Sequence, residues 1–433
     1  MILYQVLPRL WGRGRFSDWQ TPAFDYLKSL GVDAIWFTGI PRHSSGQAFV
    51  KGSLGSPYSI SDYHDVNPYL ADDSGRRMEE FGALVGRVHQ AGFRFIMDYV
   101  PNHVAPDCKD VPTLDRYDFD WDDTRKIDYS APGAWESMLE IALFWASQGV
   151  DGLRCDMVEL VPGDFLRWLV SKVKERYPAF IFIGEVYEKS GYRRYIRDIG
   201  FDLLYDKSGY YDKIRAIISG QESARALTWN WQSLGDIQGN MLNFLENHDE
   251  QRLASPYFAG DPSKAFAALA YGALFNDASF MLYSGQELGE DASEGAEGRT
   301  SIFDMVKVRT IGDICSKLEG QRQRLPVAES RVLARYRDIL RYVPRFSGMS
   351  NWDLCYCNQD SPGFIPDRHT AFVRYRAGSA WLVFCNFSPL TSEAVLSVPG
   401  ELKEKCHPAI LQDGNVKVAA KAFDATILRL SRR

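Results

Sequence analysis

Eight short apolar runs, spread over the first 283 residues, are the feature of this sequence that most restricts its fold. Each run is five to eight residues long, is rich in β-branched or aromatic residues and is bounded by glycine, proline or polar residues. Buried parallel strands have this composition because both faces of such a sheet are covered. The predicted strands are residues 2–7, 34–40, 93–100, 152–156, 180–186, 201–205, 241–245 and 279–283.

Between these runs lie longer stretches with the three- and four-residue spacing of amphipathic helices. In the first clear example, residues 76–91, the apolar positions are Met78, Phe81, Leu84, Val85 and Val88. Further helices are predicted over residues 132–147, behind a proline start signal, and over residues 165–176. Eight strands that alternate with helices favour an α/β protein with a (β/α)8 TIM barrel, although a doubly wound open sheet has the same alternation.

The pattern changes near Pro344. From about residue 370 the strand signals follow one another closely with no helix between them, over residues 370–376, 380–387, 392–398 and 423–430. We therefore predict a barrel domain over residues 1–344 and a C-terminal all-β domain, an antiparallel β-sandwich, over residues 345–433. The small, acidic stretch 292–298 is predicted to be a mobile loop on the barrel face.

The charge balance argues against two classes of partner. With 50 basic and 56 acidic residues the formal net charge is -6, which favours neither a nucleic acid nor an anionic membrane as partner. No run approaches the roughly 18 apolar residues of a membrane span, and the chain starts with a predicted strand rather than a signal peptide. The seven cysteines include no CxxC pair, so we expect a cytoplasmic protein with reduced, buried thiols.

Ionisable and polar residues gather at the carboxyl ends of four predicted strands. In chain order they are Asp98, Asn102, His103, Arg154, Asp156, Glu185, Asn247, His248 and Asp249. In a (β/α)8 barrel the carboxyl ends of all strands meet at one face, so these side chains are expected to share a site. A single charged residue there could be explained by a structural ion pair of Arg154 with Asp98 or Asp156, but the whole set indicates chemistry.

Carboxyl groups dominate this set, and neither a Ser-His-Asp order nor a glycine-rich phosphate loop is found. Two carboxyl groups on either side of a bond are what glycoside hydrolysis requires, one as nucleophile and one as proton donor. Asp156 and Asp249 should raise the pKa of Glu185, while Arg154 keeps Asp156 ionised. The histidines His103 and His248 can donate hydrogen bonds to sugar hydroxyls.

These strand ends resemble the four motifs of the α-amylase family of glycoside hydrolases, in the family's order and at its spacing. The motifs are DYVPNH at 98–103, GLRCD at 152–156, GEV at 184–186 and FLENHD at 244–249. The flanking segments GVDG at 149–152 and LYSGQE at 282–287 also look like the family's. The resemblance covers residues 1 to about 344 and extends to the C-terminal β domain.

The resemblance implies a retaining hydrolase of α-1,4-linked glucans or maltooligosaccharides that works through a covalent β-glycosyl-enzyme intermediate. Asp156 would be the nucleophile, Glu185 the acid/base, and Asp249 the carboxylate that holds the hydroxyls of the distorted sugar. The implied substrate-binding residues are Tyr58, His103, Arg154 and His248. The implied supporting residues are Asp98, Asn102 and Asn247.

The sequence departs from the family's pattern at two places. Glu159 and Leu160 stand where typical α-amylases have a Lys-His pair used for substrate and calcium, and a short excursion, residues 104–128, replaces a full domain B. We therefore expect no cofactor and no calcium ion. The alternate acidic residues of 118–123 look like a calcium loop, but Asp123 stands at the position of the sharp-turn glycine, so we interpret them as turn caps.

Several functions remain open at this point. A 4-α-glucanotransferase and a trehalose-forming isomerase of the same fold would use the same glycosyl intermediate. A non-catalytic carbohydrate-binding relative is an alternative of another class, although binding alone needs no buried set of three carboxyl groups. The expected partner is an oligosaccharide α-glucan substrate, and the sequence predicts no oligomeric state.

Overall fold

The computed structural model describes residues 1–292, 297–406 and 414–430, so residues 293–296 of the predicted loop 292–298 lie outside the description. Eight parallel strands close into a barrel in which β1 pairs with both β2 and β12, which excludes the open sheet. All eight predicted strands are confirmed. They are β1 (Ile2–Val6), β2 (Ala34–Phe37), β5 (Arg94–Tyr99), β8 (Gly152–Cys155), β9 (Ile181–Gly184), β10 (Leu203–Tyr205), β11 (Met241–Phe244) and β12 (Ser279–Tyr283).

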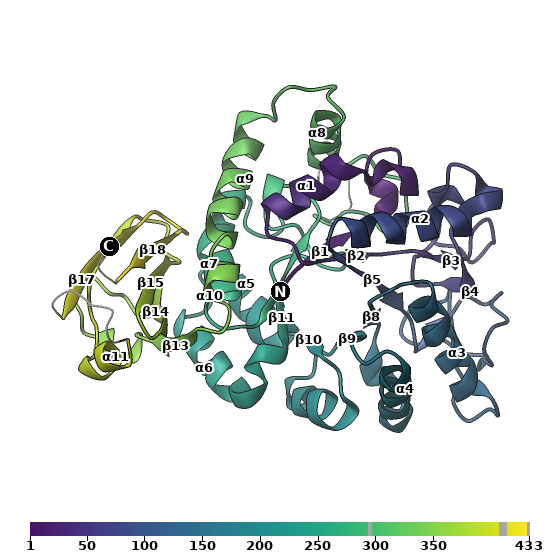
Figure 1. The fold of residues 1–433 in the computed structure, drawn as a ribbon, viewed down its shortest axis with the longest axis horizontal. Helices are drawn as coiled ribbons and strands as arrows, with labels where there is room; N and C mark the ends of the chain where they lie inside the picture. The colour runs from purple at the N-terminus through teal and green to yellow at the C-terminus, as the bar shows by residue number, and fades with distance from the viewer. Residues whose placement is uncertain (293–296, 407–413, 431–433) are drawn as a thin grey trace.

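Helices cover the outside of the barrel, with α2 and α4 on opposite sides of the strands in Figure 1. The three predicted helices correspond to α2 (Arg77–Gln90), α3 (Ala134–Ser147) and α4 (Gly163–Arg176), each with its apolar stripe buried against the strands. The other helices of the barrel region are α1 (Thr21–Ser29), α5 (Asp212–Ile218), α6 (Arg225–Leu234), α7 (Phe266–Leu274), α8 (Arg309–Leu318) and α9 (Val327–Leu340).

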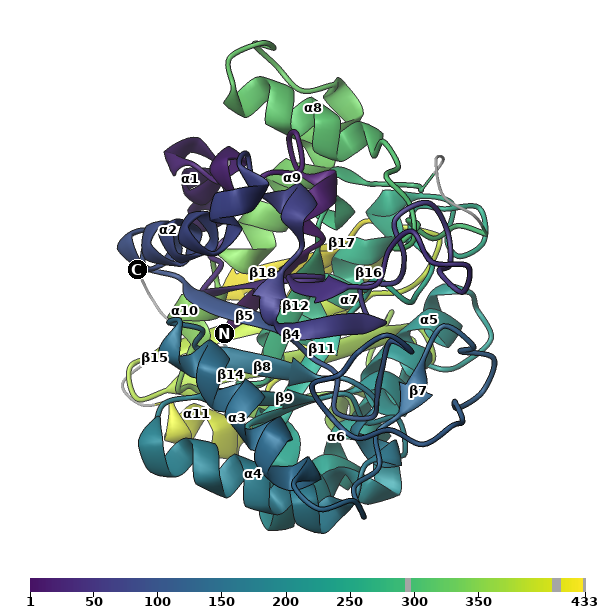
Figure 2. The same ribbon diagram turned by 90° about the vertical axis from the view of Figure 1, so that its right-hand side faces the viewer.

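Two antiparallel ribbons stand on the face where the barrel strands end. One joins β3 (Pro41–His43) to β4 (Ile60–Val66), and the other joins β6 (His103–Val104) to β7 (Arg125–Lys126). The second ribbon is the base of the short excursion, whose remaining residues form turns. In Figure 2, β4 and β7 lie on the same side of the molecule, toward the viewer.

The C-terminal region is a β-sandwich, as predicted. One sheet has the order β13 (Ser350–Asp353), β14 (His369–Arg376), β15 (Ser379–Asn386) and β18 (Ala425–Arg429), and β16 (Ser392–Ser397) pairs with β17 (Asn415–Ala420). A separate apolar core fills the space between the two sheets. The expectation that no helix interrupts these strands is wrong, because the good helix formers after Pro399 build α11 (Gly400–Lys405).

The sandwich packs against the barrel through β14 and β15, which lie beside α7, at the left of Figure 1. Phe372 makes edge contacts with the stacked rings of Tyr271 and Phe275, and the buried guanidinium of Arg374 donates to the carbonyls of Leu274, Phe346 and Met349. The predicted boundary after residue 344 falls inside the short helix α10 (Val343–Phe346), and the domain limits stay a prediction.

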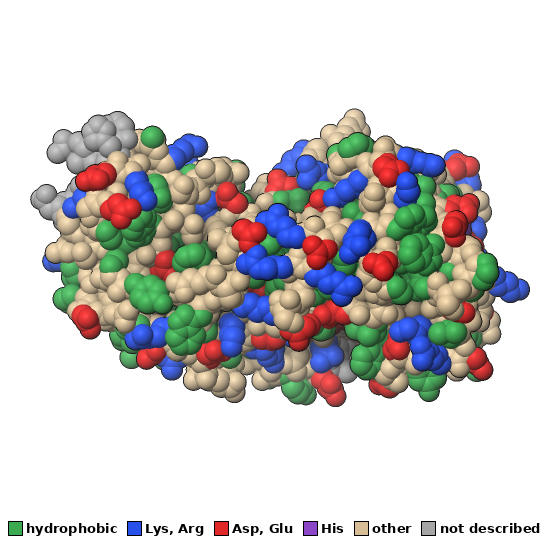
Figure 3. Space-filling view, turned by 90° about the horizontal axis from the view of Figure 1, so that it is seen from below, with side chains coloured by type: hydrophobic (Ala, Val, Ile, Leu, Met, Phe, Trp, Pro, Cys, Tyr) green, Lys and Arg blue, Asp and Glu red, His purple; other side chains and the backbone are tan. Residues whose placement is uncertain are grey.

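The surface agrees with the charge balance of the sequence, since acidic and basic side chains are interspersed over the face in Figure 3. Among the described residues, no helix is both long and apolar enough to cross a membrane. The expectation of buried cysteines is met by Cys155, Cys315, Cys385 and Cys406, whereas Cys108 and Cys355 are half-buried. It is wrong at Cys357, which is exposed in the short 3-10 helix Tyr356–Asn358 of the sandwich.

Candidate active site

The carboxyl ends of β5, β8 and β9 and the loop after β11 surround a cavity of about 580 Å³. Six of the predicted site residues line it: Tyr58, His103, Asp156, Glu185, His248 and Asp249. Arg154 and Asp98 lie directly beneath them, fully buried, and Asn247 supports the loop from behind. The structure therefore brings together side chains that are up to 191 residues apart in the chain, from Tyr58 to Asp249.

The guanidinium group of Arg154 is the centre of the charge cluster. Its Nη1 lies 2.5 Å from Asp156 Oδ1 and 3.6 Å from Asp98 Oδ1, and its Nη2 lies 2.8 Å from Glu185 Oε1. Both ion pairs considered from the sequence are thus present, together with a third that was not predicted. One cation faces three buried carboxyl groups, with Asp249 nearby, so the cluster holds more acid than a purely structural ion pair needs.

Asp156 is positioned by the turn that follows β8. Its backbone N–H donates to the Tyr99 carbonyl, and the next residue, Met157, has a left-handed conformation with φ of 44°. This conformation aims the Met157 N–H at Glu185 Oε2, 2.9 Å away. Burial raises the pKa of Asp156, and the adjacent Arg154 guanidinium opposes this by favouring the ionised form.

Glu185 contacts three groups: the Arg154 guanidinium, the Met157 N–H and the Tyr187 hydroxyl. The Tyr187 hydroxyl donates to Glu185 Oε1 at 2.9 Å. Burial raises the pKa of Glu185 to about 7, the charge of Asp156 raises it further, and Arg154 acts against both. A carboxyl group with this pKa still carries a proton near neutral pH, which is what a general acid requires.

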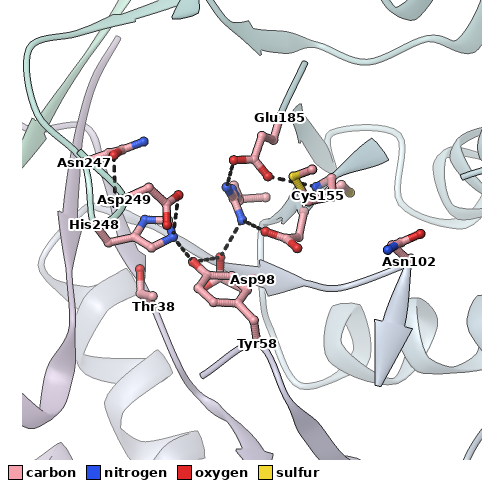
Figure 4. A network of polar contacts seen from close by, with 12 residues as sticks. Thr38, Tyr58, Asp98, Asn102, Cys155, Glu185, Asn247, His248 and Asp249 are labelled. Carbon is pink, nitrogen blue, oxygen red and sulfur yellow. Dashed lines mark hydrogen bonds and ion pairs between the residues drawn. The ribbon is translucent and has the colours of Figure 1, made fainter. Parts of the chain in front are cut away.

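Asp249 lies across the cavity, next to a stacked pair of rings. The ring of Tyr58 stacks on that of His248 at a centroid distance of 5.1 Å, and the two side chains share a hydrogen bond of 2.5 Å between Tyr58 Oη and His248 Nε2. Figure 4 shows Tyr58, His248, Asp249 and Glu185 converging on one space. The Asp249 side chain keeps 39% exposure, while its enclosed position and the charge of Glu185 raise its pKa.

Asn102 does not join this cluster and lies to one side in Figure 4. Its amide nitrogen donates to Asp118 Oδ2 at 2.9 Å and lies 3.2 Å from His103 Nδ1. Lys126 Nζ lies between the two partners, 3.2 Å from Asn102 Oδ1 and 2.8 Å from Asp118 Oδ2. Asn102 is thus placed to support His103, which itself faces the cavity.

The contacts of Lys126 with Asn102 and Asp118 test whether a calcium ion could bind here. The Lys126 ammonium lies on the oxygens of Asn102 and Asp118, where a bound cation would have to lie, and Glu159 accepts hydrogen bonds from the Tyr187 and Glu188 N–H groups. The oxygens of Asn102 and Asp118 do not fit a calcium ion, because the positively charged Lys126 ammonium already lies on them. Elsewhere among the described residues, the half-buried Asp62, His64 and Asp110 have ligand atoms within 4.8 Å of one another.

Several residues around the site were not predicted from the sequence. Tyr187 follows Glu185 by two residues, a spacing that could have placed it on the same face, and Tyr205 ends β10 and meets Arg154 Nε at 3.2 Å. Gln5, at the end of β1, contacts His248 Nδ1 at 2.7 Å. Phe119 and Trp121 line the cavity from the excursion, a stretch that was considered only for its acidic residues.

Comparisons with known proteins agree with this geometry. The sequence profile of the α-amylase catalytic domain matches residues 18–112 and 117–327. An α-amylase of Haloarcula japonica is 28% identical over 67% of this chain and 44% of its own length, so this chain spans less than half of that relative. An α-1,4-glucan:maltose-1-phosphate maltosyltransferase of Cereibacter sphaeroides is 28% identical over 47% of the chain and 34% of its own length.

Two further relatives complete the comparison. An intracellular maltogenic amylase of Bacillus subtilis is 27% identical over 62% of this chain and 47% of its own length. A maltogenic α-amylase structure from Thermotoga neapolitana superposes with a TM-score of 0.70, at 23% identity over 100% of this chain and 97% of the other, which supports the fold. Because the profile covers well over half of the residues, this chain belongs to the α-amylase family of glycoside hydrolases, through that family's catalytic domain.

Proposed function

We propose that this protein is a retaining hydrolase of α-1,4-linked glucans or maltooligosaccharides. The observation that carries the proposal is the placement of Asp156 and Glu185 on one guanidinium group, Arg154, at the floor of an open cavity that also holds Asp249. A carboxylate kept ionised beside a carboxyl group that keeps its proton is the pair that glycoside hydrolysis uses.

In the first step, the Asp156 carboxylate attacks the anomeric carbon and forms a bond to it. The glycosidic carbon–oxygen bond breaks, its electron pair stays on the leaving oxygen, and that oxygen takes the proton of Glu185. The result is a covalent β-glycosyl-enzyme. In the second step Glu185 removes a proton from water, the water oxygen bonds to the anomeric carbon, and Asp156 leaves as a carboxylate. Two inversions restore the α configuration.

The other residues are assigned to binding and support. His103 and His248 face the cavity, and burial lowers their pKa values, so both rings are neutral near pH 7. His103 is assigned to the sugar hydroxyls. The ring nitrogens of His248 already contact Gln5 and Tyr58, so His248 would exchange its contact with Tyr58 for a sugar hydroxyl when the substrate binds. Tyr58 provides the ring under the reacting sugar, and Asp249 accepts from its hydroxyls. Asp98, Asn102 and Asn247 support these groups from behind.

We propose that this chemistry proceeds without a calcium ion or other cofactor. The support is the Lys126 ammonium on Asn102 and Asp118, which supplies a positive charge from within the chain. The name of the Bacillus subtilis relative, an intracellular maltogenic amylase, supports the predicted cytoplasmic location.

A second candidate is transfer rather than hydrolysis. The same glycosyl-enzyme can be captured by a sugar hydroxyl in place of water, and the similarity to the Cereibacter sphaeroides maltosyltransferase favours this alternative. The two functions differ only in the acceptor, so they share Asp156, Glu185 and Asp249.

The test is a time course of products from maltohexaose, separated by chromatography, with Asp156→Asn as the inactive control. Only shorter sugars, released first as the α anomer in a proton NMR time course, are expected. Longer sugars would identify a transferase, and a non-reducing disaccharide formed from maltose would identify the isomerase. First release of the β anomer, or an Asp156→Asn variant at near wild-type rate, would overturn the proposed mechanism.

A further inference from the structure

Two aromatic side chains of the excursion form a platform on the cavity wall, away from the carboxyl cluster. Phe119 is 69% exposed although it is one of the largest apolar residues of the chain. Its ring lies 4.7 Å from that of Trp121, which in turn lies 5.2 Å from the ring of His103. All three line the cavity that holds Asp156 and Glu185, so the platform is continuous with the site of chemistry.

The backbone at Phe119 departs from ordinary preferences. Its φ is 55°, in the left-handed region that glycine and asparagine favour and that a bulky aromatic residue rarely adopts. An exposed phenylalanine in this conformation gains no buried contact that would offset the strain. Strained conformations of this kind gather at ligand sites, where the surrounding structure holds them in place.

Polar contacts hold the platform from both sides. Before it, Asp118 is bound by Asn102 and Lys126. After it, the Asp123 carboxylate pairs with Lys51 Nζ at 3.2 Å, and the same ammonium donates to the Asp120 carbonyl at 3.0 Å. The rings therefore project into the cavity from a loop that is fixed at its two ends.

The loop that carries Lys51 also contacts the segment of Phe303 and Asp304. The Leu54 N–H donates to the Phe303 carbonyl at 3.1 Å, and the Ser53 N–H donates to Asp304 Oδ1 at 2.8 Å. Phe303 and its neighbour Ile302 line the cavity as well. The same cavity is therefore lined by apolar side chains from two separate segments of the chain, the excursion and residues 302–303.

We propose that Phe119 and Trp121 bind a glucose unit of the substrate chain that lies beyond the units at the cleavage point. A glucose ring presents a face of C–H groups that can cover an aromatic ring, while its hydroxyls at the edge stay hydrated, so burial of this face gives a hydrophobic gain without burying unpaired polar groups. This inference rests on the proposed function and adds to it a preference for longer oligosaccharides.

The decisive variant is Phe119→Gly, because glycine adopts a φ of 55° freely and removes the ring without adding strain. We expect its Tm to equal or exceed that of the wild type. Its kcat/KM for maltohexaose should fall by about tenfold, mainly through KM, as loss of one well-placed aromatic contact does. Its kcat/KM for maltotriose should change less than about twofold.

Two controls complete the experiment. Trp229→Ala removes an aromatic ring that is 58% exposed on α6, outside the cavity, and should leave both substrates unaffected. Phe119→Tyr keeps a ring and should restore the preference for maltohexaose. An equal change for both substrates in Phe119→Gly, or no change for either, would refute the platform while leaving hydrolysis intact. If wild-type enzyme cleaves neither sugar, the proposed function itself is wrong.

Discussion

At the scale of single residues, the site depends on the balance between the positive charge of Arg154 and the carboxyl groups that surround it. Its guanidinium group is fully buried, lies 5.2 Å from the ring centre of Trp36 and 5.4 Å from that of Tyr205, and pairs with Asp156 and Glu185. Burying a charge costs free energy that only close partners offset. Arg154 therefore permits two buried carboxyl groups to lie side by side, because its charge opposes the rise in pKa that burial gives to both.

Replacement of Arg154 should damage stability as well as activity. Arg154→Met leaves Asp156 and Glu185 buried without a cation, and removal of one partner from a buried pair costs about 3–5 kcal/mol. We expect a clear drop in Tm by calorimetry and loss of nearly all turnover. Arg154→Lys keeps the charge but not the fork of donors, and should recover part of the Tm but little activity. A Met variant with wild-type Tm would contradict this account.

The pH dependence of the reaction should follow Glu185. Its pKa of about 7 in the free protein means that the proton needed by the leaving oxygen is present below that pH and is lost above it. The kcat/KM for a maltooligosaccharide should therefore fall about tenfold per pH unit above the pKa. With α-maltosyl fluoride, whose fluoride leaves without a proton, kcat/KM should stay nearly constant over the same range. Parallel profiles for both substrates would exclude Glu185 as the acid.

At the scale of elements, the β6–β7 ribbon connects support to site. In this ribbon His103 pairs directly with Lys126, so the strand that carries a cavity histidine lies opposite the ammonium group that binds Asn102 and Asp118. Lys126, in the excursion, thereby orients Asn102, which follows β5.

Because Lys126 supplies a positive charge at this position, we expect that chelators do not reduce the activity of the enzyme. Lys126→Met keeps most of the side-chain volume but leaves Asp118 without its positive partner, so the ribbon should loosen, with a lower Tm and a raised KM through His103. Wild-type activity should be unchanged by EDTA and by added calcium, measured as initial rate on maltohexaose. Loss of activity in EDTA that calcium restores would refute the internal-cation role.

The sequence predicts elements well where the local pattern and the tertiary environment agree. The barrel strands are confirmed because their composition reflects burial on both faces, and the charged residues at their ends stand out against that background. Phe119 and Trp121 were missed because nothing local reveals exposure or a positive φ. The strand β17 was missed because it contains Asn415, Lys417 and two alanines, which are residues depleted in strands, and α11 was missed because six residues are too few to show a helical period.

At the scale of the whole molecule, the sandwich covers one side of the barrel rather than the cavity. Its sheet packs on α7, and Arg335 reaches Asp424 across the junction at 2.7 Å. The junction residues belong to the same apolar core as the barrel helices. We therefore expect the two parts to unfold together, and we expect the sandwich to act on stability rather than on the reacting sugar.

Arg374 provides a test of whether the sandwich affects stability alone or also affects the reaction. It is almost completely buried and donates to three backbone carbonyls and to Asp277, so Arg374→Met leaves several acceptors unpaired at about 1–3 kcal/mol each. We expect a lower Tm but an unchanged kcat/KM at 25 °C. A variant with selectively reduced kcat/KM on folded protein would show that the sandwich influences the cavity. Lys421→Met, at a surface turn of the sandwich, is the control.

The pairing of β1 with β12 also has a consequence for biosynthesis. Ile2 lies in register with Phe280, so β1 has no partner on that edge until the 278 residues from Ile2 to Phe280 have been synthesised. At about 5–20 residues per second, the nascent chain carries this open edge for roughly 14–56 seconds. An unpaired strand whose residues are all buried in the folded protein is a template for association with other chains. Slowed translation should therefore increase aggregation of this protein more than that of a fold whose neighbouring strands are all close in sequence.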